Sequence, residues 1–432
     1  MFPPSQMIIK PIKRISGAIT VPADKSISHR AVMFGSIADG TTRVNNFLAA
    51  DDCKRTIEAF REMGIDIKVK SQKAKGNSLE IHGKGLHGLK EPQGPIDCGN
   101  SGTTMRLLSG ILAGQNFYSM LTGDESLSVR PMSRIALPLR LMGADVRGDY
   151  PPLKIRGGRL KPVDYKSPVA SAQVKSCVLL AGLFADGITS VTEPLPSRDH
   201  TERMLELFGV KLKRSGLKVS IKGRQKLKAR LLDVPADISS AAFFMVAASI
   251  VKNSKLTIKS VGINPTRSGI LDILKKMNAR IKIKNKTSTP EPMADLIVET
   301  ANLKSTTIKG SFISRAIDEL PVIMVAATQA KGTTKIIGAG ELRVKETDRI
   351  KSMSEGLNKM GANIKVVGDN IYIKGPSKLN GACLNSRGDH RTAMSFAIAG
   401  LVANGQATIE NTECILTSFP DFKKTLSKIS KL

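Results

Sequence analysis

A strand–helix unit recurs six times along this chain of 432 residues. In each copy a small residue ends an apolar helical segment and opens a β-branched segment, at intervals of 66 to 79 positions: Gly40, Gly114, Gly187, Asn253, Gly332 and Gly405. An amphipathic helical segment follows and usually ends at a residue that tolerates left-handed backbone: Gly64, Gly143, Gly209, Asn278 and Gly361. The sequence therefore predicts an α/β fold whose units each read strand, buried helix, strand, surface helix, strand.

A short polar stretch precedes each apolar helix, and we expect it at the start of that helix. The six stretches begin at Ala23, Cys98, Val169, Pro235, Ser314 and Gly388. They contain Ser, Thr, Asp and Asn, which cap helix N-termini. Since an N-terminus has unpaired N–H groups and about half a positive charge, three N-termini facing one another would bind anions. At the fourth stretch we expect only a helix cap. The charged residues of the other stretches indicate a role in binding or catalysis.

The composition favours a protein that binds small anions. The chain carries 66 Lys and Arg against 37 Asp and Glu, a formal net charge of +29, which favours anionic partners. Aromatic residues are only 4% and Trp is absent, so the stacking platforms that hold single-stranded nucleic acid are lacking. Five dispersed cysteines favour a reducing cytoplasm over a disulfide framework. We expect no structural zinc, and no membrane span because no apolar run reaches about 18 residues.

Charged and small residues gather at the predicted helix starts. Lys25, Ser26 and Arg30 fall in the first turns of a buried helix, where solvated charges have no structural use. The turn at 97–106 consists largely of small residues and would let a ligand approach the backbone, and Arg130 follows in the next loop. Equivalent loops of later units hold Ser171, Gln173 and Arg198, then the run 343–349, then 389–391. Their recurrence predicts a composite site for phosphorylated anions.

These motifs resemble the 5-enolpyruvylshikimate-3-phosphate synthase family. The resemblance runs from about Ile9 to Phe422 in the family's order: P-A-D-K-S-I-S-H-R, G-N-S-G-T-T-M-R, S-A-Q, S-R-D-H-T-E, D-E-L-P, V-K-E-T-D-R-I and D-H-R-T-A-M-S-F. It implies an α/β fold of the inside-out barrel type, with two domains of three units and a cleft that closes on substrate. The implied domains are 24–235 and, discontinuously, 1–23 plus 236–432, with a hinge near 234–237.

The family transfers the enolpyruvyl group of phosphoenolpyruvate to the 5-hydroxyl of shikimate 3-phosphate, without metal or organic cofactor, in the shikimate pathway. The resemblance places these residues at shikimate 3-phosphate: Lys25, Ser26, Arg30, Ser171, Ala172, Gln173, Arg198, Asp318 and Lys345. It places another set at phosphoenolpyruvate: Lys25, Asn100, Gly102, Arg130, Gln173, Arg349 and Arg391. The implied catalytic groups are Lys25, the base Asp318 and the acid–base Glu346. We expect a cytoplasmic monomer.

Each assignment has a structural alternative. Asp318 and Glu319 are also typical of an acidic pair at a helix start, and little function is expected of Glu319. Glu346 could form a surface ion pair with Arg343 or Arg349, which would contribute little energy. His29, His200 and His390 are expected to support the site or start helices, and Cys98 to be a small buried residue.

Two departures and three rival functions remain open at this stage. Thr417 stands where some family members have lysine, and Ala172 where some have serine. The nearest rival is the related enzyme acting on UDP-N-acetylglucosamine, but its mobile loop carries a catalytic cysteine that the loop 124–132 lacks. A nucleic-acid binder would use the basic surface, and an RNA-end-processing enzyme built of related repeats would need a nucleotide-accepting histidine.

Overall fold

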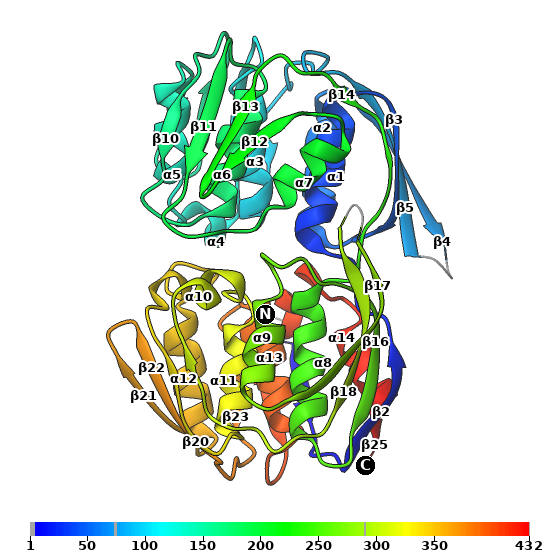
Figure 1. Cartoon of the computed structure of the whole chain (residues 1–432), viewed down its shortest axis with the longest axis vertical. Helices are drawn as coiled ribbons and strands as arrows, with labels where there is room; N and C mark the ends of the chain where they lie inside the picture. Colours follow the sequence, from blue (N-terminus) through cyan, green and yellow to red (C-terminus); the bar gives the residue numbers. More distant parts are fainter. Residues whose placement is uncertain (1–4, 73–75, 289–290, 432) are drawn as a thin grey trace. The chain divides into compact units, whose positions relative to one another are not determined.

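The computed structural model describes residues 5–72, 76–288 and 291–431 and divides the chain into two compact units. One unit, here called the continuous unit, comprises Ala23–Val234. The other, the split unit, comprises the segment up to Pro22 together with Pro235 onwards. These limits lie one residue before those expected from the sequence. Figure 1 shows buried helices flanked by sheets in each unit.

In its described residues the continuous unit contains three buried helices, four further helices and three sheets. Its buried helices are α1 (Lys25–Ile37), α3 (Gly102–Leu112) and α6 (Ala172–Gly182). The further helices are α2 (Asp51–Glu62), α4 (Glu125–Ser128), α5 (Ser133–Leu141) and α7 (His200–Leu207). The strands are β3 (Ala38–Phe47), β4 (Asp66–Gln72), β5 (Gly76–Lys84), β6 (Ile96–Asp97), β7 (Tyr118–Thr122), β8 (Asp145–Arg147), β9 (Leu153–Arg156), β10 (Asp164–Lys166), β11 (Ile188–Thr192), β12 (Leu212–Ser215), β13 (Lys218–Lys222), β14 (Leu227–Lys228) and β15 (Leu231–Asp233).

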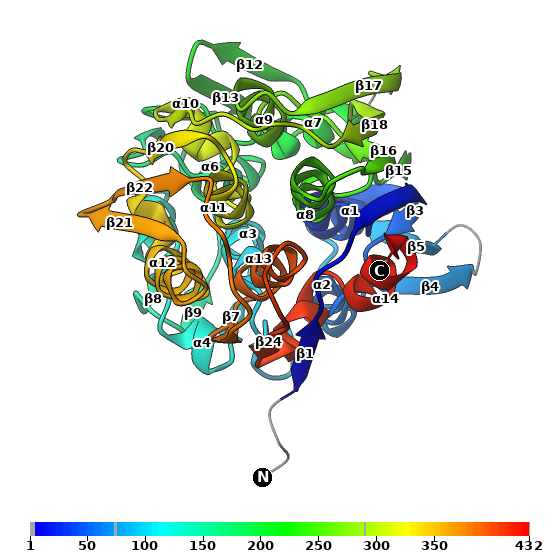
Figure 2. The ribbon, with the colours of Figure 1, turned by 90° about the horizontal axis from the view of Figure 1, so that it is seen from below.

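The split unit repeats this plan around α8 (Ile238–Ile250), α11 (Leu320–Thr328) and α13 (His390–Gly400). Its further helices are α9 (Gly269–Lys276), α10 (Ser311–Arg315), α12 (Arg349–Lys359), α14 (Phe422–Ile429) and the 3-10 helices η1 (Gly340–Leu342) and η2 (Thr412–Thr417). The strands are β1 (Gln6–Ile9), β2 (Arg14–Ile19), β16 (Lys255–Gly262), β17 (Arg280–Thr287), β18 (Met293–Glu299), β19 (Thr307–Ile308), β20 (Gly332–Ile336), β21 (Asn363–Val367), β22 (Asn370–Gly375), β23 (Cys383–Asn385), β24 (Ala407–Glu410) and β25 (Ser430–Lys431). Figure 2 views α8, α11 and α13 nearly end-on, inside a ring of strands.

The repeat differs from the predicted one by an extra strand. After the surface helix the chain forms a hairpin, as in β12–β13 and β21–β22, where the sequence predicted a single strand. The second strand of that hairpin pairs antiparallel with the strand that follows the buried helix, and a short strand completes the sheet in parallel. In the sixth copy no hairpin follows, and β1 from the N-terminal segment pairs with β24 instead.

Strands are exchanged where the chain passes from one unit to the other. The strand before α1 is β2, which pairs with β16 of the fourth copy. The strands before α8 are β14 and β15, which pair with β3 of the first copy. Each crossing of the chain between the units therefore contributes strands to a sheet of the unit that it leaves. The N-terminal segment supplies strands to two sheets of the split unit.

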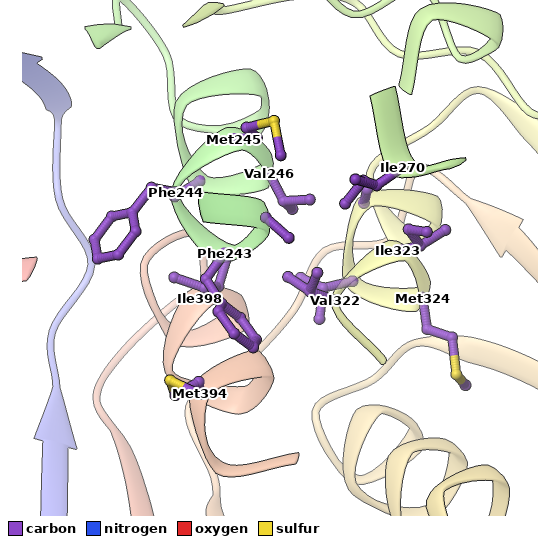
Figure 3. Close-up of a cluster of buried hydrophobic side chains, with 14 of the residues drawn as sticks. Phe243, Phe244, Met245, Val246, Ile270, Val322, Ile323, Met324, Met394 and Ile398 are labelled. Atoms are coloured by element: carbon purple, nitrogen blue, oxygen red, sulfur yellow. The ribbon is translucent and has the colours of Figure 1, made fainter. Parts of the chain in front are cut away.

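The three buried helices of each unit pack around an apolar core. Figure 3 shows Phe243 of α8, Val322 of α11 and Ile398 of α13 in one cluster, and all three are at most 1% exposed. Burying each such side chain contributes about 1.5–3 kcal/mol. Because these helices are apolar on every side, only their ends are available for polar chemistry.

Glycines mark the ends of the repeated elements. All five predicted helix-ending residues, Gly64, Gly143, Gly209, Asn278 and Gly361, have positive φ, which confirms their predicted role. Gly114 is needed for space, because a Cβ there would lie 2.1 Å from Cγ of Phe184. Another glycine, which sequence reasoning missed, recurs at the end of the hairpin. A Cβ at Gly83 would lie 2.2 Å from the carbonyl oxygen of Gly35. Only glycine therefore fits where β5 passes the end of α1.

Candidate active site

Side chains cap five of the six buried helices, as the polar stretches predicted. The capping residues are Asp24, Ser101, Ser171, Asp237 and Asp389, each accepting a hydrogen bond from a backbone N–H of the first turn. The exception is α11, where Glu319 occupies the cap position without accepting such a bond and Pro321 lies in the first turn. The carboxylate of Glu319 is thus left for other contacts.

Hydrogen bonds join the three helix starts of the continuous unit. Arg30 of α1 donates from Nη2 to Oγ of Ser176 on α6 (2.9 Å) and from Nε to Oγ1 of Thr201 on α7 (2.7 Å). Gln173 of α6 donates to Oγ1 of Thr103 on α3 (3.1 Å) and accepts from Arg106 (2.8 Å). Sequence reasoning quoted Arg106 in a motif without giving it this role. Two predicted site residues therefore tie α6 to its neighbours: Arg30 links it to α1, and Gln173 links it to α3.

His29 links α1 to α3 through a chain of hydroxyls. Its Nδ1 lies 2.7 Å from Oγ1 of Thr56, which lies 2.8 Å from Oγ1 of Thr104 on α3. Burial, with the nearby charges of Lys25 and Arg30, lowers the pKa of His29 well below its ordinary value. The ring is therefore neutral and supports the helix starts, as the sequence predicted.

Arg130 is a buried guanidinium held by neutral groups. It is 8% exposed and donates to Oδ1 of Asn100 (2.8 Å), to the backbone oxygen of Asn100 (3.4 Å) and to Oγ of Ser126 (2.9 Å). Within the described residues no carboxylate forms an ion pair with it. Gly102 adjoins this group, since a Cβ there would lie 3.0 Å from Nη1 of Arg106 and 3.7 Å from Nη1 of Arg130. Asn100, Gly102 and Arg130 thus lie together at the start of α3.

The other predicted residues of the continuous unit lie at the same helix starts. Lys25 pairs with Asp52 of α2 at 2.9 Å, with both side chains more than 80% buried. The Ser26 carbonyl accepts a hydrogen bond from Nη1 of Arg30 (3.0 Å). Ser171, Ala172 and Gln173 open α6 and are half-buried, as is Arg198 in the loop before α7.

The split unit gathers three carboxylates around Arg349. The guanidinium is 1% exposed and donates to Oδ2 of Asp389 (2.7 Å), Oε2 of Glu346 (2.6 Å) and Oδ1 of Asp318 (3.4 Å). Burial opposes its charge, but Asp389, Glu346 and Asp318 outweigh that effect and raise the pKa of Arg349 above its ordinary value. Arg349 therefore keeps a full charge beside the two predicted acid–base residues.

Asp318 lies between two arginines. Its Oδ2 is 3.6 Å from Nη2 of Arg391, and Nη1 of Arg391 donates to the Asp318 carbonyl oxygen (3.3 Å). Asp318 is 14% and Glu346 21% exposed, so both carboxylates can be reached from outside. Lys345, beside Glu346 in the chain, is half-buried.

Of the two ion pairs considered for Glu346, the one with Arg349 forms. Arg343 pairs instead with Asp348 and Asp369, both at 2.9 Å. The Arg349 partner of Glu346 is fully buried, so this pair is screened far less than a surface pair.

The fourth copy holds more than the expected cap. Arg267, 3% exposed, pairs with Glu319 at 2.7 Å and with Asp237 at 3.6 Å, and the Ser239 hydroxyl contacts both Arg267 and Glu319. Glu319 thus anchors the residue after Asp318 to the start of α8. Sequence reasoning missed this cluster, because Arg267 lies in a loop that no motif marks. The expectations of a scaffold role for the fourth copy and of no catalytic role for Glu319 stay predictions.

The remaining predicted positions are structural. Thr417 Oγ1 lies 3.5 Å from Nδ1 of His390, the first residue of α13, and donates to the Cys414 carbonyl oxygen. Cys98 is fully buried, and its burial raises the pKa of the thiol. The described residues contain no group of three or more His, Cys, Asp or Glu that could hold a metal ion. Nor do they contain a helix long and apolar enough to cross a membrane.

The fold is that of the enolpyruvyl transferases. The enolpyruvyl transferase NikO from Streptomyces tendae superposes with a TM-score of 0.81 over 99% of this chain and 98% of its own, at 17% identity, a likeness of fold alone. The family model for EPSP synthase (3-phosphoshikimate 1-carboxyvinyltransferase) matches residues 9–426, and the chain belongs to this family.

Relatives of higher identity agree with this membership. The 3-phosphoshikimate 1-carboxyvinyltransferase of Bacillus cereus is 52% identical over 98% of this chain and 99% of its own length. That of Brevibacillus brevis is also 52% identical, with the same coverage. The EPSP synthase of Acinetobacter baumannii superposes with a TM-score of 0.87 at 48% identity, covering 98% of each chain.

Proposed function

We propose that this chain transfers the 1-carboxyvinyl group of phosphoenolpyruvate to the 5-hydroxyl of shikimate 3-phosphate and releases phosphate. The observation that carries the proposal is Arg130. A buried charge without a counter-charge is costly, and the partners of this guanidinium in the described part of the chain are all neutral. A phosphate or carboxylate accepts two parallel hydrogen bonds from such a group. Phosphoenolpyruvate offers both.

The continuous unit supplies most of the anion contacts in this proposal. Lys25, Ser26, Arg30, Ser171, Ala172, Gln173 and Arg198 bind shikimate 3-phosphate, together with Asp318 and Lys345 of the split unit. Lys25, Asn100, Gly102, Arg130 and Gln173 bind phosphoenolpyruvate, together with Arg349 and Arg391 of the split unit. Donors fixed in advance by the fold stabilise the charge that moves to the departing phosphate.

The split unit supplies the proton transfers. Asp318 takes the proton of the 5-hydroxyl of shikimate 3-phosphate as the hydroxyl oxygen bonds to the central carbon of phosphoenolpyruvate. Glu346 protonates the methylene carbon. Glu346 then takes a proton back as the bond to phosphate breaks. Asp318 lies within 4 Å of the guanidinium groups of Arg349 and Arg391, which would also face the anionic substrate there (Oδ1 to Nη1 of Arg349 3.4 Å, Oδ2 to Nη2 of Arg391 3.6 Å). Lys25 assists from its place at both substrates.

The test measures phosphate release from phosphoenolpyruvate with and without shikimate 3-phosphate. We expect release only with both substrates, and a loss of about 10²–10⁴-fold in turnover for Asp318→Asn and Glu346→Gln. Asp369→Asn is the matched control, because that carboxylate also pairs with an arginine but lies on the surface. Turnover with UDP-N-acetylglucosamine in place of shikimate 3-phosphate, or undiminished turnover in both variants, would falsify the proposal.

Arg391→Ala tests the placement of the substrates. We expect it to raise the KM for phosphoenolpyruvate more than the KM for shikimate 3-phosphate, since its guanidinium is assigned to the former. Equal effects on both constants would contradict that placement. We also propose a cytoplasmic monomer, which sedimentation of the purified protein and cell fractionation would check.

A further inference from the structure

Glu193 is a buried carboxylate that none of the sequence motifs includes. It follows β11, is 4% exposed and uses both of its oxygens. Oε1 accepts the backbone N–H of Ser171 (2.9 Å), and Oε2 accepts the hydroxyl of Ser197 (2.8 Å). Ser171 opens the S-A-Q stretch, and Ser197 precedes Arg198. One carboxylate therefore joins two segments assigned to shikimate 3-phosphate.

A buried lysine holds this carboxylate in place. Nζ of Lys175, on α6, lies 2.9 Å from Oε2 of Glu193 and 2.8 Å from Oε1 of Glu202 on α7. All three side chains are at most 5% exposed. Burial alone would lower the pKa of Lys175, but the two carboxylates raise it. A buried triad of this kind rarely adds net stability over apolar packing, so its retention calls for another reason.

We infer that Glu193 is a positioning residue for shikimate 3-phosphate. It acts through Ser171 and Ser197: by fixing the start of α6 against the loop before Arg198, it sets the two segments in one arrangement before substrate arrives. Donors held in place in this way lose little freedom on binding, which strengthens binding and orients the reacting hydroxyl. This inference rests on the proposed function.

Glu202 provides a matched control. It pairs with the same lysine and is equally buried, but its contact joins α6 to α7 at the level of Lys175. Glu202→Gln therefore removes a buried ion pair like that of Glu193 while leaving the bonds to Ser171 and Ser197 in place. If Glu193 had only a structural role, the two substitutions would have the same effect on the binding of shikimate 3-phosphate.

The experiment compares Glu193→Gln with Glu202→Gln in the whole protein. We expect Glu193→Gln to weaken the binding of shikimate 3-phosphate, measured by calorimetry, by about 10- to 100-fold, the effect of losing hydrogen bonds to a charged group. The KM for phosphoenolpyruvate at saturating shikimate 3-phosphate should stay within about twofold, as should shikimate 3-phosphate binding by Glu202→Gln. Urea unfolding of both variants checks that they lose comparable stability.

Equal binding by the two variants, or normal binding by Glu193→Gln, would overturn the inference. If Glu193→Gln does not fold, Glu193→Asp replaces it. This variant keeps the charge but shortens the reach to Ser171 and Ser197, and the same weakening is expected, with normal binding again contradicting the inference. A wild-type protein that neither binds nor converts shikimate 3-phosphate would instead contradict the proposed function.

Discussion

Each unit buries an arginine beside a helix start, Arg349 in the split unit and Arg130 in the continuous unit, but the groups around the two arginines differ. In the split unit Arg349 lies among three carboxylates of the protein itself. In the continuous unit Arg130 donates, within the described residues, to an amide oxygen, a backbone carbonyl and a hydroxyl. The same repeat thus yields a cluster with its own counter-charge and a cluster suited to an external anion.

This difference agrees with the roles proposed for the two units, which are anion binding in the continuous unit and proton transfer in the split unit. The carboxylates around Arg349 include the two groups proposed to move protons, whereas a guanidinium with neutral partners, such as Arg130, is suited to holding phosphate. Repetition of one strand–helix unit along the chain therefore does not require repetition of its chemistry, because a few side chains beside the helix starts decide it.

The largest expected effect comes from removing each arginine in turn. Arg349→Met leaves three carboxylates without their shared counter-charge and should lower the free energy of unfolding by about 3–5 kcal/mol. Arg130→Met removes a charge whose partners among the described residues are neutral, and it should cost less than about 1 kcal/mol. Urea denaturation of both variants measures this. Equal losses of unfolding free energy in the two variants would contradict the proposed difference between the units.

The second prediction concerns the anchor beside the catalytic base. Glu319→Gln removes the charged partner of Arg267 at 2.7 Å and should cost about 1.5–3 kcal/mol of unfolding free energy. Because Glu319 follows Asp318 directly, turnover should also fall, with the KM for shikimate 3-phosphate changed less. Glu355→Gln, at an exposed pair with Arg387, is the control and should change neither quantity. Full turnover in Glu319→Gln would show that the network supports the fold alone.

The smallest prediction uses pH to probe the continuous unit. His29 is neutral when folded, and its pKa lies below the ordinary value of 6.5, so below that pH the unfolded chain binds the extra proton. The free energy of unfolding should therefore fall as pH drops below about 6.5, by up to about 1.4 kcal/mol per pH unit from this group. His29→Gln should remove that part of the slope. Urea titrations between about pH 7.5 and pH 5.5 measure it, and an unchanged slope in the variant would exclude His29 as its source.

Several local features of the fold could be predicted from the sequence. The caps at Asp24 and Ser171 and the left-handed helix end at Gly64 follow from residues within a few positions of one another. The hairpin strand was missed because its alternating residues merge with the strand predicted beside it. Glu193 and Arg267 were missed because their charged partners Lys175 and Glu319 lie 18 and 52 residues away and no motif surrounds them.

The sequence by itself determined the six repeats, the helix starts, the family motifs and the residues expected to carry the chemistry. Only the tertiary structure decided which strands are exchanged between the copies, as when β2 joins β16 and β15 joins β3. It also decided which arginine meets carboxylates and which meets neutral groups. The physical reason is one of range: capping and helix termination are settled within a turn of backbone, whereas strand pairing and buried charge depend on what folding brings together.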